Sequence, residues 1–182
     1  GLAANAFVVT HCASATAALS WITMEWIHRG KPTTLGAASG AVAGLVAITP
    51  ASGFVGPASA LIIGAMAGII CYGGILLKSK LGYDDSLDVV GIHGLGGTWG
   101  ALATGLFAST LINPGGANGL FFGNPGQLWI QFISVAATWI FAFGMTSIIL
   151  KAVDLIVGLR VTEADEESGL DISQHNETAY SF

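Results

Sequence analysis

Long apolar blocks separated by short polar segments run along most of this chain. A helix needs about 20 apolar residues to cross the hydrocarbon core of a bilayer, and five blocks reach that length. They lie near residues 6–28, 35–53, 57–81, 87–110 and 128–158. Blocks this long lack the alternation typical of strands. The pattern therefore predicts an all-α, polytopic transmembrane helix bundle over residues 1–159 and a polar tail over residues 160–182.

The connections between the blocks differ in charge. The second and fourth connections carry no charge, whereas basic residues flank the other block ends: Arg29, Lys31, Lys78, Lys80, Lys151 and Arg160. If the five blocks cross in alternation, all six fall on one side, which the positive-inside rule makes cytoplasmic. We therefore expect the start of the chain outside and the tail inside the cell.

Composition supports a membrane protein and argues against other classes. Hydrophobic residues make up 53% of the chain and charged residues 9%, against about 25% charged in a soluble domain. There is no basic patch for nucleic acid, and Cys12 and Cys71 lie in different blocks without metal-ligand spacing. Asp and Glu fall at block ends, in connections and in the tail, so we expect no buried carboxylate pair, no enzyme activity, no metal and no cofactor.

Glycines recur at a spacing of four in three of the blocks. They are Gly36, Gly40 and Gly44, then Gly64 and Gly68, then Gly96 and Gly100. In lipid, small residues at this spacing let helix backbones approach closely. The pattern predicts a tightly packed bundle, although the same glycines could instead line a narrow pore.

The glycine-rich segment 88–100 places one ionisable side chain, His93, inside an apolar block. Such residues usually face a water-filled path or a partner inside the bundle. His93 is therefore a candidate pore residue, with a buried packing histidine as the alternative. A histidine in a charge-free bundle suits a small neutral or transiently neutral solute better than a metal ion.

Several motifs together resemble one family, the Amt/Mep/Rh ammonium transporters, and within it the Amt branch. The resemblance covers the whole chain and rests on Trp21-Ile-Thr-Met-Glu-Trp26, Arg29-Gly-Lys-Pro-Thr33, residues 36–56, Gly91-Ile-His-Gly-Leu-Gly-Gly97 and Gly158-Leu-Arg-Val161. It implies ammonium or ammonia transport, with methylammonium as an analogue, by a homotrimer in the lipid bilayer of the plasma membrane. Family subunits have eleven helices, so the resemblance implies that this chain is the C-terminal part, with the last five. A Rh-like gas channel and an ammonium sensor are the alternatives.

The resemblance also assigns roles to single residues. His93 matches the second histidine of the family's pore pair, and Val89, four residues earlier on the same helical face, matches the apolar pore wall. Ser39 and Asp88 match positions toward the cytoplasmic vestibule, where Asp88 could equally be structural.

In the tail, the resemblance implies a cytoplasmic regulatory segment that docks on neighbouring subunits and helps receive P-II-type signalling proteins. The matching residues are Gly158, Arg160, Gly169, Asp171, His175 and Tyr180. Asn176 stands where the family usually has glycine, and asparagine tolerates the same left-handed backbone fairly well.

Overall fold

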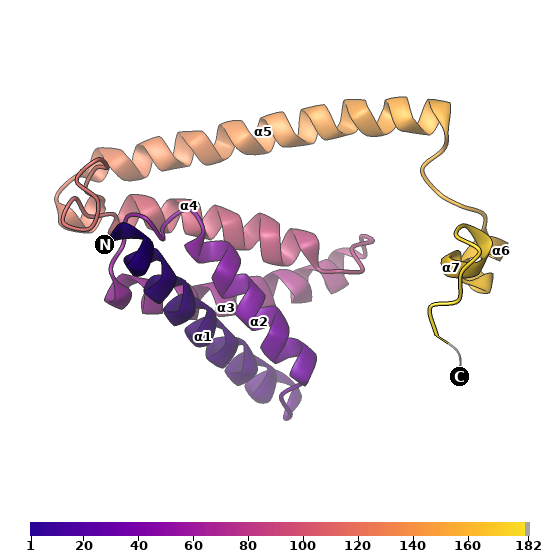
Figure 1. Cartoon of the computed structure of the whole chain (residues 1–182), viewed down its shortest axis with the longest axis horizontal. Coiled ribbons are helices and arrows are strands. Elements are labelled where there is room, and N and C mark those ends of the chain that lie inside the picture. The colour runs from indigo at the N-terminus through magenta and orange to yellow at the C-terminus, as the bar shows by residue number, and fades with distance from the viewer. Residues whose placement is uncertain (181–182) are drawn as a thin grey trace. The chain divides into compact units, whose positions relative to one another are not determined.

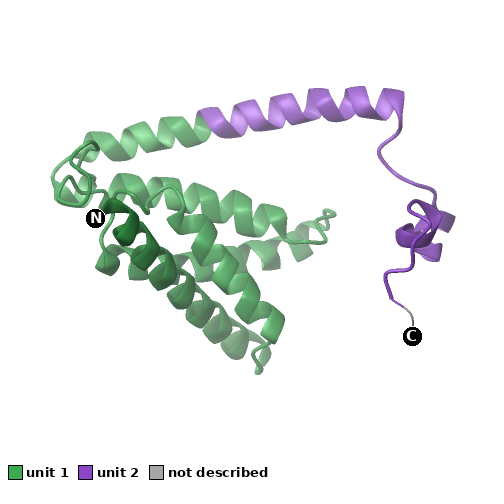
Figure 2. Ribbon diagram, viewed as in Figure 1, with its two compact units in different colours: residues 1–136 green, residues 137–182 purple. Residues whose placement is uncertain are grey.

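The computed structural model describes residues 1–180, and within this range the chain contains helices and no strand (Figure 1). The elements are α1 (Leu2–Arg29), α2 (Thr34–Ile48), α3 (Pro57–Leu81), the π-helical turn η1 (Val90–Gly94), α4 (Leu95–Phe107), the 3₁₀ turn η2 (Leu120–Phe122), α5 (Pro125–Ile156), α6 (Glu163–Ser168) and α7 (Leu170–Ser173). The predicted all-α class is confirmed. The chain divides into two compact units, Gly1–Ala136 and Ala137–Phe182 (Figure 2).

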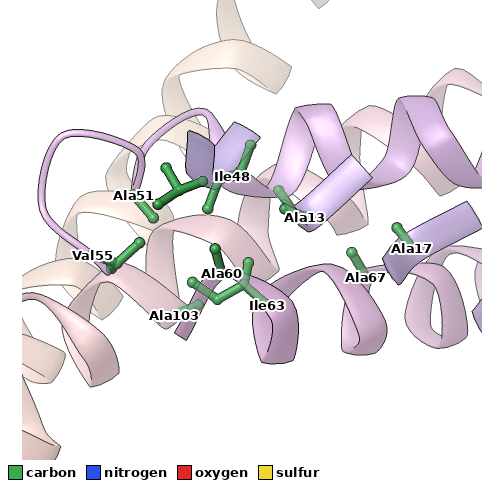
Figure 3. Close-up of a cluster of buried hydrophobic side chains, with 11 residues drawn as sticks. Ala13, Ala17, Ile48, Ala51, Val55, Ala60, Ile63, Ala67 and Ala103 are labelled. Carbon is green, nitrogen blue, oxygen red and sulfur yellow. The ribbon is translucent and has the colours of Figure 1, made fainter. Parts of the chain in front are cut away.

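The core of the first unit is built mainly from small side chains. Helix α1 packs against α2 and α3, and α2 also packs against α4. Figure 3 shows the cluster where these helices meet, which includes Ala13, Ala17, Ile48, Ala51, Val55, Ala60, Ile63, Ala67 and Ala103. Alanine adds little apolar surface, so close van der Waals approach of the helices is the main source of attraction here.

The glycines at spacing four lie in these contacts. All seven are buried. A Cβ atom on Gly44 or Gly64 would collide with the carbonyl oxygen of Ala13, and one on Gly100 would collide with that of Ala47. The predicted helix-packing role is confirmed, and the alternative that these seven buried glycines line a narrow pore is wrong.

Three helices are long and apolar enough to cross a membrane: α1, α3 and α5. The second apolar block, predicted over 35–53, overran its helix, because α2 ends at Ile48. Pro50 has no N–H for the carbonyl of Val46, and the N–H of Thr49 takes that carbonyl instead at 3.3 Å. The chain then turns, with Ser52 N–H donating to the carbonyl of Ile48 at 2.8 Å.

The fourth block, predicted over 87–110, also overran the helical segment, which runs from Val90 to Phe107 through η1 and α4. Ala108 is extended, and its carbonyl accepts the N–H of Gly119 at 2.7 Å. The helix ends there because this backbone pairs with the following loop. For α2 and for η1–α4, crossing of the membrane stays a prediction.

Candidate functional site

His93 lies in the π-helical turn η1, which leads directly into α4. The N–H of Leu95 is shared between the carbonyls of Val90 and Ile92, and the bond to Val90 is the five-residue step that defines a π-turn. Such turns usually occur singly inside α-helices and often at functional sites. The His93 side chain is exposed in this chain, so its imidazole is open to a partner or to solvent.

Val89 precedes the π-turn, and its side chain is 47% exposed. Residues four apart share a face in an α-helix, which was the basis for placing Val89 beside His93. Because the π-turn widens the repeat, that spacing rule does not hold across residues 90–94. The pore-wall role of Val89 stays a prediction that rests on the resemblance and on its exposure.

Three charged residues surround the start of this segment. The carboxylate of Asp85 accepts the N–H groups of Val89 and Val90, each at 2.9 Å. Lys78 forms an ion pair with the carboxylate of Asp88 and donates to the carbonyl of Asp85 at 2.8 Å. These bonds satisfy two of the N–H groups that a helix leaves free at its N-terminus.

Asp88 has a left-handed backbone, with φ of 56°. Together with its ion pair to Lys78, this gives Asp88 a structural role, one of the two readings open from the sequence. A further role in a vestibule stays a prediction. Ser39 is half-buried on α2, and α2 packs against η1 and α4, so the helix of Ser39 adjoins the segment of His93.

Sequence reasoning missed a buried carboxylate at the end of α1. Glu25 is only 4% exposed, and its carboxylate accepts the backbone N–H of Thr33 at 2.9 Å and the Thr33 hydroxyl at 3.1 Å. The hydroxyl oxygen of Thr33 in turn accepts the N–H of Gly36 at 2.9 Å, which caps α2. From the sequence, Thr33 could have been recognised as the N-cap residue of α2. That Thr33 also bonds to Glu25 could not, because this contact depends on how the connection between α1 and α2 folds.

In the tail, two carboxylates make specific bonds: the exposed Glu166 and the half-buried Asp171. Glu166 accepts two bonds from the guanidinium of Arg160, at 2.8 and 3.1 Å, and this pairing lowers the pKa of Glu166. Asp171 accepts the N–H of Ala179 at 3.0 Å, and this backbone bond lowers the pKa of Asp171. The acidic run is therefore locally folded around these contacts.

The tail residues that the resemblance singled out lie in or beside these turns. Asn176 has a φ of 51°, so it adopts the left-handed backbone that asparagine tolerates. Gly158 and Gly169 are also left-handed, with φ of 79° and 94°. His175 and Tyr180 are exposed. Their role in binding a signalling protein stays a prediction.

Known proteins resemble the chain over nearly its whole length. A sequence model described as the Ammonium Transporter Family matches residues 1–180. The chain is 52% identical to an ammonium transporter of Bacillus subtilis, covering 99% of this chain and 45% of the relative, and 50% identical to ammonium transporter Amt1 of Archaeoglobus fulgidus, covering 98% and 45%. It is similar to the crystal structure of Saccharomyces cerevisiae Mep2, with a TM-score of 0.84, 35% identity and coverage of 90% and 38%.

The chain thus spans less than half the length of the curated relatives it matches. The match to the family model nevertheless extends over both units, from the helices of the first unit to the tail. The sequence identity to the Bacillus subtilis transporter is near 50% over almost the whole chain. The solved structure of Mep2 has the same fold as the chain. The chain belongs to the ammonium transporter family.

Proposed function

We propose that this chain is part of an ammonium transporter and that the η1–α4 segment contributes to the path that ammonia follows. The observation that carries the proposal is the exposed His93 in a π-turn at the start of an uncharged helical segment. A bare ammonium ion would lose tens of kcal/mol of hydration on entering a medium of low dielectric constant. The cation must therefore lose its proton or exchange its water for fixed polar groups.

A neutral imidazole offers one donor and one acceptor nitrogen. We infer that one ring nitrogen of His93 bonds to a second histidine of the pore pair, contributed by the rest of the transporter. The other ring edge then faces the lumen, where it guides ammonia or relays a proton. In this proposal Val89 keeps the path narrow and apolar, and Ser39 and Asp88 lie toward its cytoplasmic end.

The same proposal includes topology and assembly. Five crossings put all six basic residues on the cytoplasmic side of the plasma membrane, together with the tail. The close contacts that glycines allow between α1, α2, α3 and α4 support a compact helix bundle in each subunit. In this proposal, three such subunits form a homotrimer. The local fold around Asp171 and Asn176 would let the tail receive a P-II-type protein.

The experiment is methylammonium uptake into liposomes that contain the protein expressed from its full reading frame. His93→Ala should abolish uptake or remove its selectivity against potassium, because the apolar path would lose its only fixed imidazole from this chain. His11→Ala is the matched control, since the His11 ring is exposed on α1 and bonds only locally, to the carbonyl of Phe7 at 2.9 Å. Unchanged uptake and selectivity in His93→Ala would overturn the proposal.

A sensor and a Rh-like gas channel are separated in the same assay. A sensor would bind methylammonium without moving it, and a gas channel would conduct without selecting the ammonium analogue. Transport is favoured because the curated relatives near 50% identity are named as transporters. The Amt-type tail also argues against the gas channel.

A further inference from the structure

One face of α3 runs alongside the π-turn that bears His93. Cys71, Gly74 and Lys78 are three and four residues apart, so they lie along one side of the helix. A Cβ atom on Gly74 would meet the Cδ1 of Leu95 at 2.6 Å and the Cα of Gly91 at 3.2 Å. The missing side chain therefore lets the π-turn lie directly against the backbone of α3.

Cys71 contacts the C-terminal part of the turn. Its buried thiol donates to the carbonyl oxygen of Ile92, with an Sγ to O distance of 3.7 Å. The same carbonyl also receives a share of the N–H of Leu95, which bonds to Val90 as well. A thiol is a weak donor, but here it adds a bond to the residue that immediately precedes His93.

Lys78 contacts the N-terminal part of the same segment, two helical turns from Cys71. Its ammonium group pairs with the carboxylate of Asp88 and donates to the carbonyl of Asp85. The carboxylate of Asp85 in turn holds the N–H groups of Val89 and Val90. Lys78 thereby fixes the backbone that enters the π-turn, including the left-handed Asp88.

The form of the π-turn bears on where the imidazole points. A π-turn inserts a residue into the helical repeat, so every side chain after it is rotated relative to those before it. If the turn relaxed to ordinary α-helix, His93 would face a different direction relative to Val89. Helix α3 contacts this segment at both ends, through Cys71 and through Lys78.

We propose that Cys71 and Lys78 are positioning residues that hold the π-turn and thereby set the direction of the His93 ring. This inference rests on the proposed function, in which His93 faces the path of ammonia. It assigns to α3 a part in transport although neither side chain touches the solute.

The test measures methylammonium uptake against pH for Cys71→Ala and Lys78→Gln in the protein from its full reading frame. Each should lower uptake by roughly tenfold and shift its pH profile, in line with the loss of groups that orient a functional histidine. Cys71→Ser and Lys78→Arg keep a donor and should recover most of the uptake. Cys12→Ala and Lys80→Gln are matched controls away from the turn and should behave as the unaltered protein.

A second measurement follows the ring itself. In protein labelled at histidine, the ¹⁵N signals of His93, assigned by their absence in His93→Ala, should move in Cys71→Ala and Lys78→Gln while those of His11 stay. Unmoved His93 signals, or uptake and pH profiles that match the unaltered protein, would overturn the inference. If Lys78→Gln does not fold, Asp88→Asn removes the same ion pair, and asparagine still accepts the left-handed backbone.

The outcomes separate this inference from the proposed function. If the unaltered protein moves methylammonium and His93→Ala does not, the proposed function stands whatever the α3 variants do. If the unaltered protein does not move methylammonium, the proposed function fails. The ¹⁵N signals then still decide whether Cys71 and Lys78 orient the ring.

Discussion

The helices of residues 1–136 and the tail of residues 160–180 are shaped by different contacts. In the first unit, buried alanines and glycines bring backbones into contact, and the buried carboxylate of Glu25 is bonded to neutral donors. In the tail, carboxylates make the contacts that shape the turns: the exposed Glu166 bonds to Arg160, and the half-buried Asp171 bonds to Ala179. Packing of small uncharged groups depends little on pH or salt, whereas exposed charged contacts depend on both.

The difference suits the two proposed roles. A path for ammonia requires a framework that keeps its geometry while the solute passes, and close-packed interiors do not deform continuously. A regulatory segment must change partners, and weak exposed contacts can be exchanged at low cost. The comparison can be tested by disturbing one unit at a time and observing whether the other responds.

The largest effect is expected where two backbones touch. Gly100→Leu would drive a side chain into the backbone of Ala47, and overpacking of this kind costs about 3 kcal/mol or more when backbone must move. We expect poor folding in detergent, measured by thermal unfolding and size-exclusion chromatography. Gly73→Leu is the control on α3, because a Cβ atom there meets nothing within 4 Å. A normal melting temperature for Gly100→Leu would show that the helices are not closely packed.

A smaller loss is expected at the buried carboxylate. Glu25→Ala would remove the acceptor of the N–H and hydroxyl of the exposed Thr33, and losing such hydrogen bonds costs about 1 kcal/mol each. Glu25→Gln keeps one acceptor oxygen and should retain more of the stability. The measurement is the melting temperature of the purified protein. Equal values for Glu25→Ala and the unaltered protein would mean that Glu25 does not hold the α1–α2 connection.

The features predicted from sequence are those that local chemistry determines. Continuous apolar blocks predict helices, and glycines at spacing four predicted the contacts of Gly44 and Gly100, because only a missing side chain allows such approach. That Asn176 could adopt a left-handed backbone followed from a similarly local reason. The end of α2 was also within reach of the sequence, since Pro50 removes the N–H that would extend the helix.

The candidate site was predicted less completely. His93 was identified because it is the one ionisable residue well inside its block, but the π-turn around it was not. The contacts to that turn and to its start come from Cys71 and Lys78 on another helix, and no local sequence pattern indicates them. The burial of Glu25 was not predicted for the same reason. It depends on the position of Thr33, which follows the turn between α1 and α2.

In the tail, acidification should release the turn around Asp171. The bond from Ala179 lowers the pKa of Asp171 below its ordinary value of 3.8, so the folded form is favoured above that value. The stabilisation is lost as the pH falls through the lowered pKa. In protein labelled at alanine, the amide signal of Ala179 should shift between pH 5 and about 2 while the alanines of α1 stay. An Ala179 amide that does not titrate would contradict the bond, and Asp171→Ala should remove the shift.

The smallest effect is expected at the Arg160–Glu166 pair. Both side chains are exposed, with relative exposures of 73% and 37%, and exposed pairs contribute little to stability. The guanidinium lowers the pKa of Glu166, so raising the salt concentration to about 1 M should return that pKa toward its ordinary value by screening. Arg160→Gln should do the same at low salt, as measured by titration of labelled Glu166. Neither change should alter the melting temperature of the helices, because charge contacts of the tail do not hold the glycine and alanine contacts of α1, α2, α3 and α4. A fall in melting temperature with either change would mean that the two units share stability that their separate contacts do not explain.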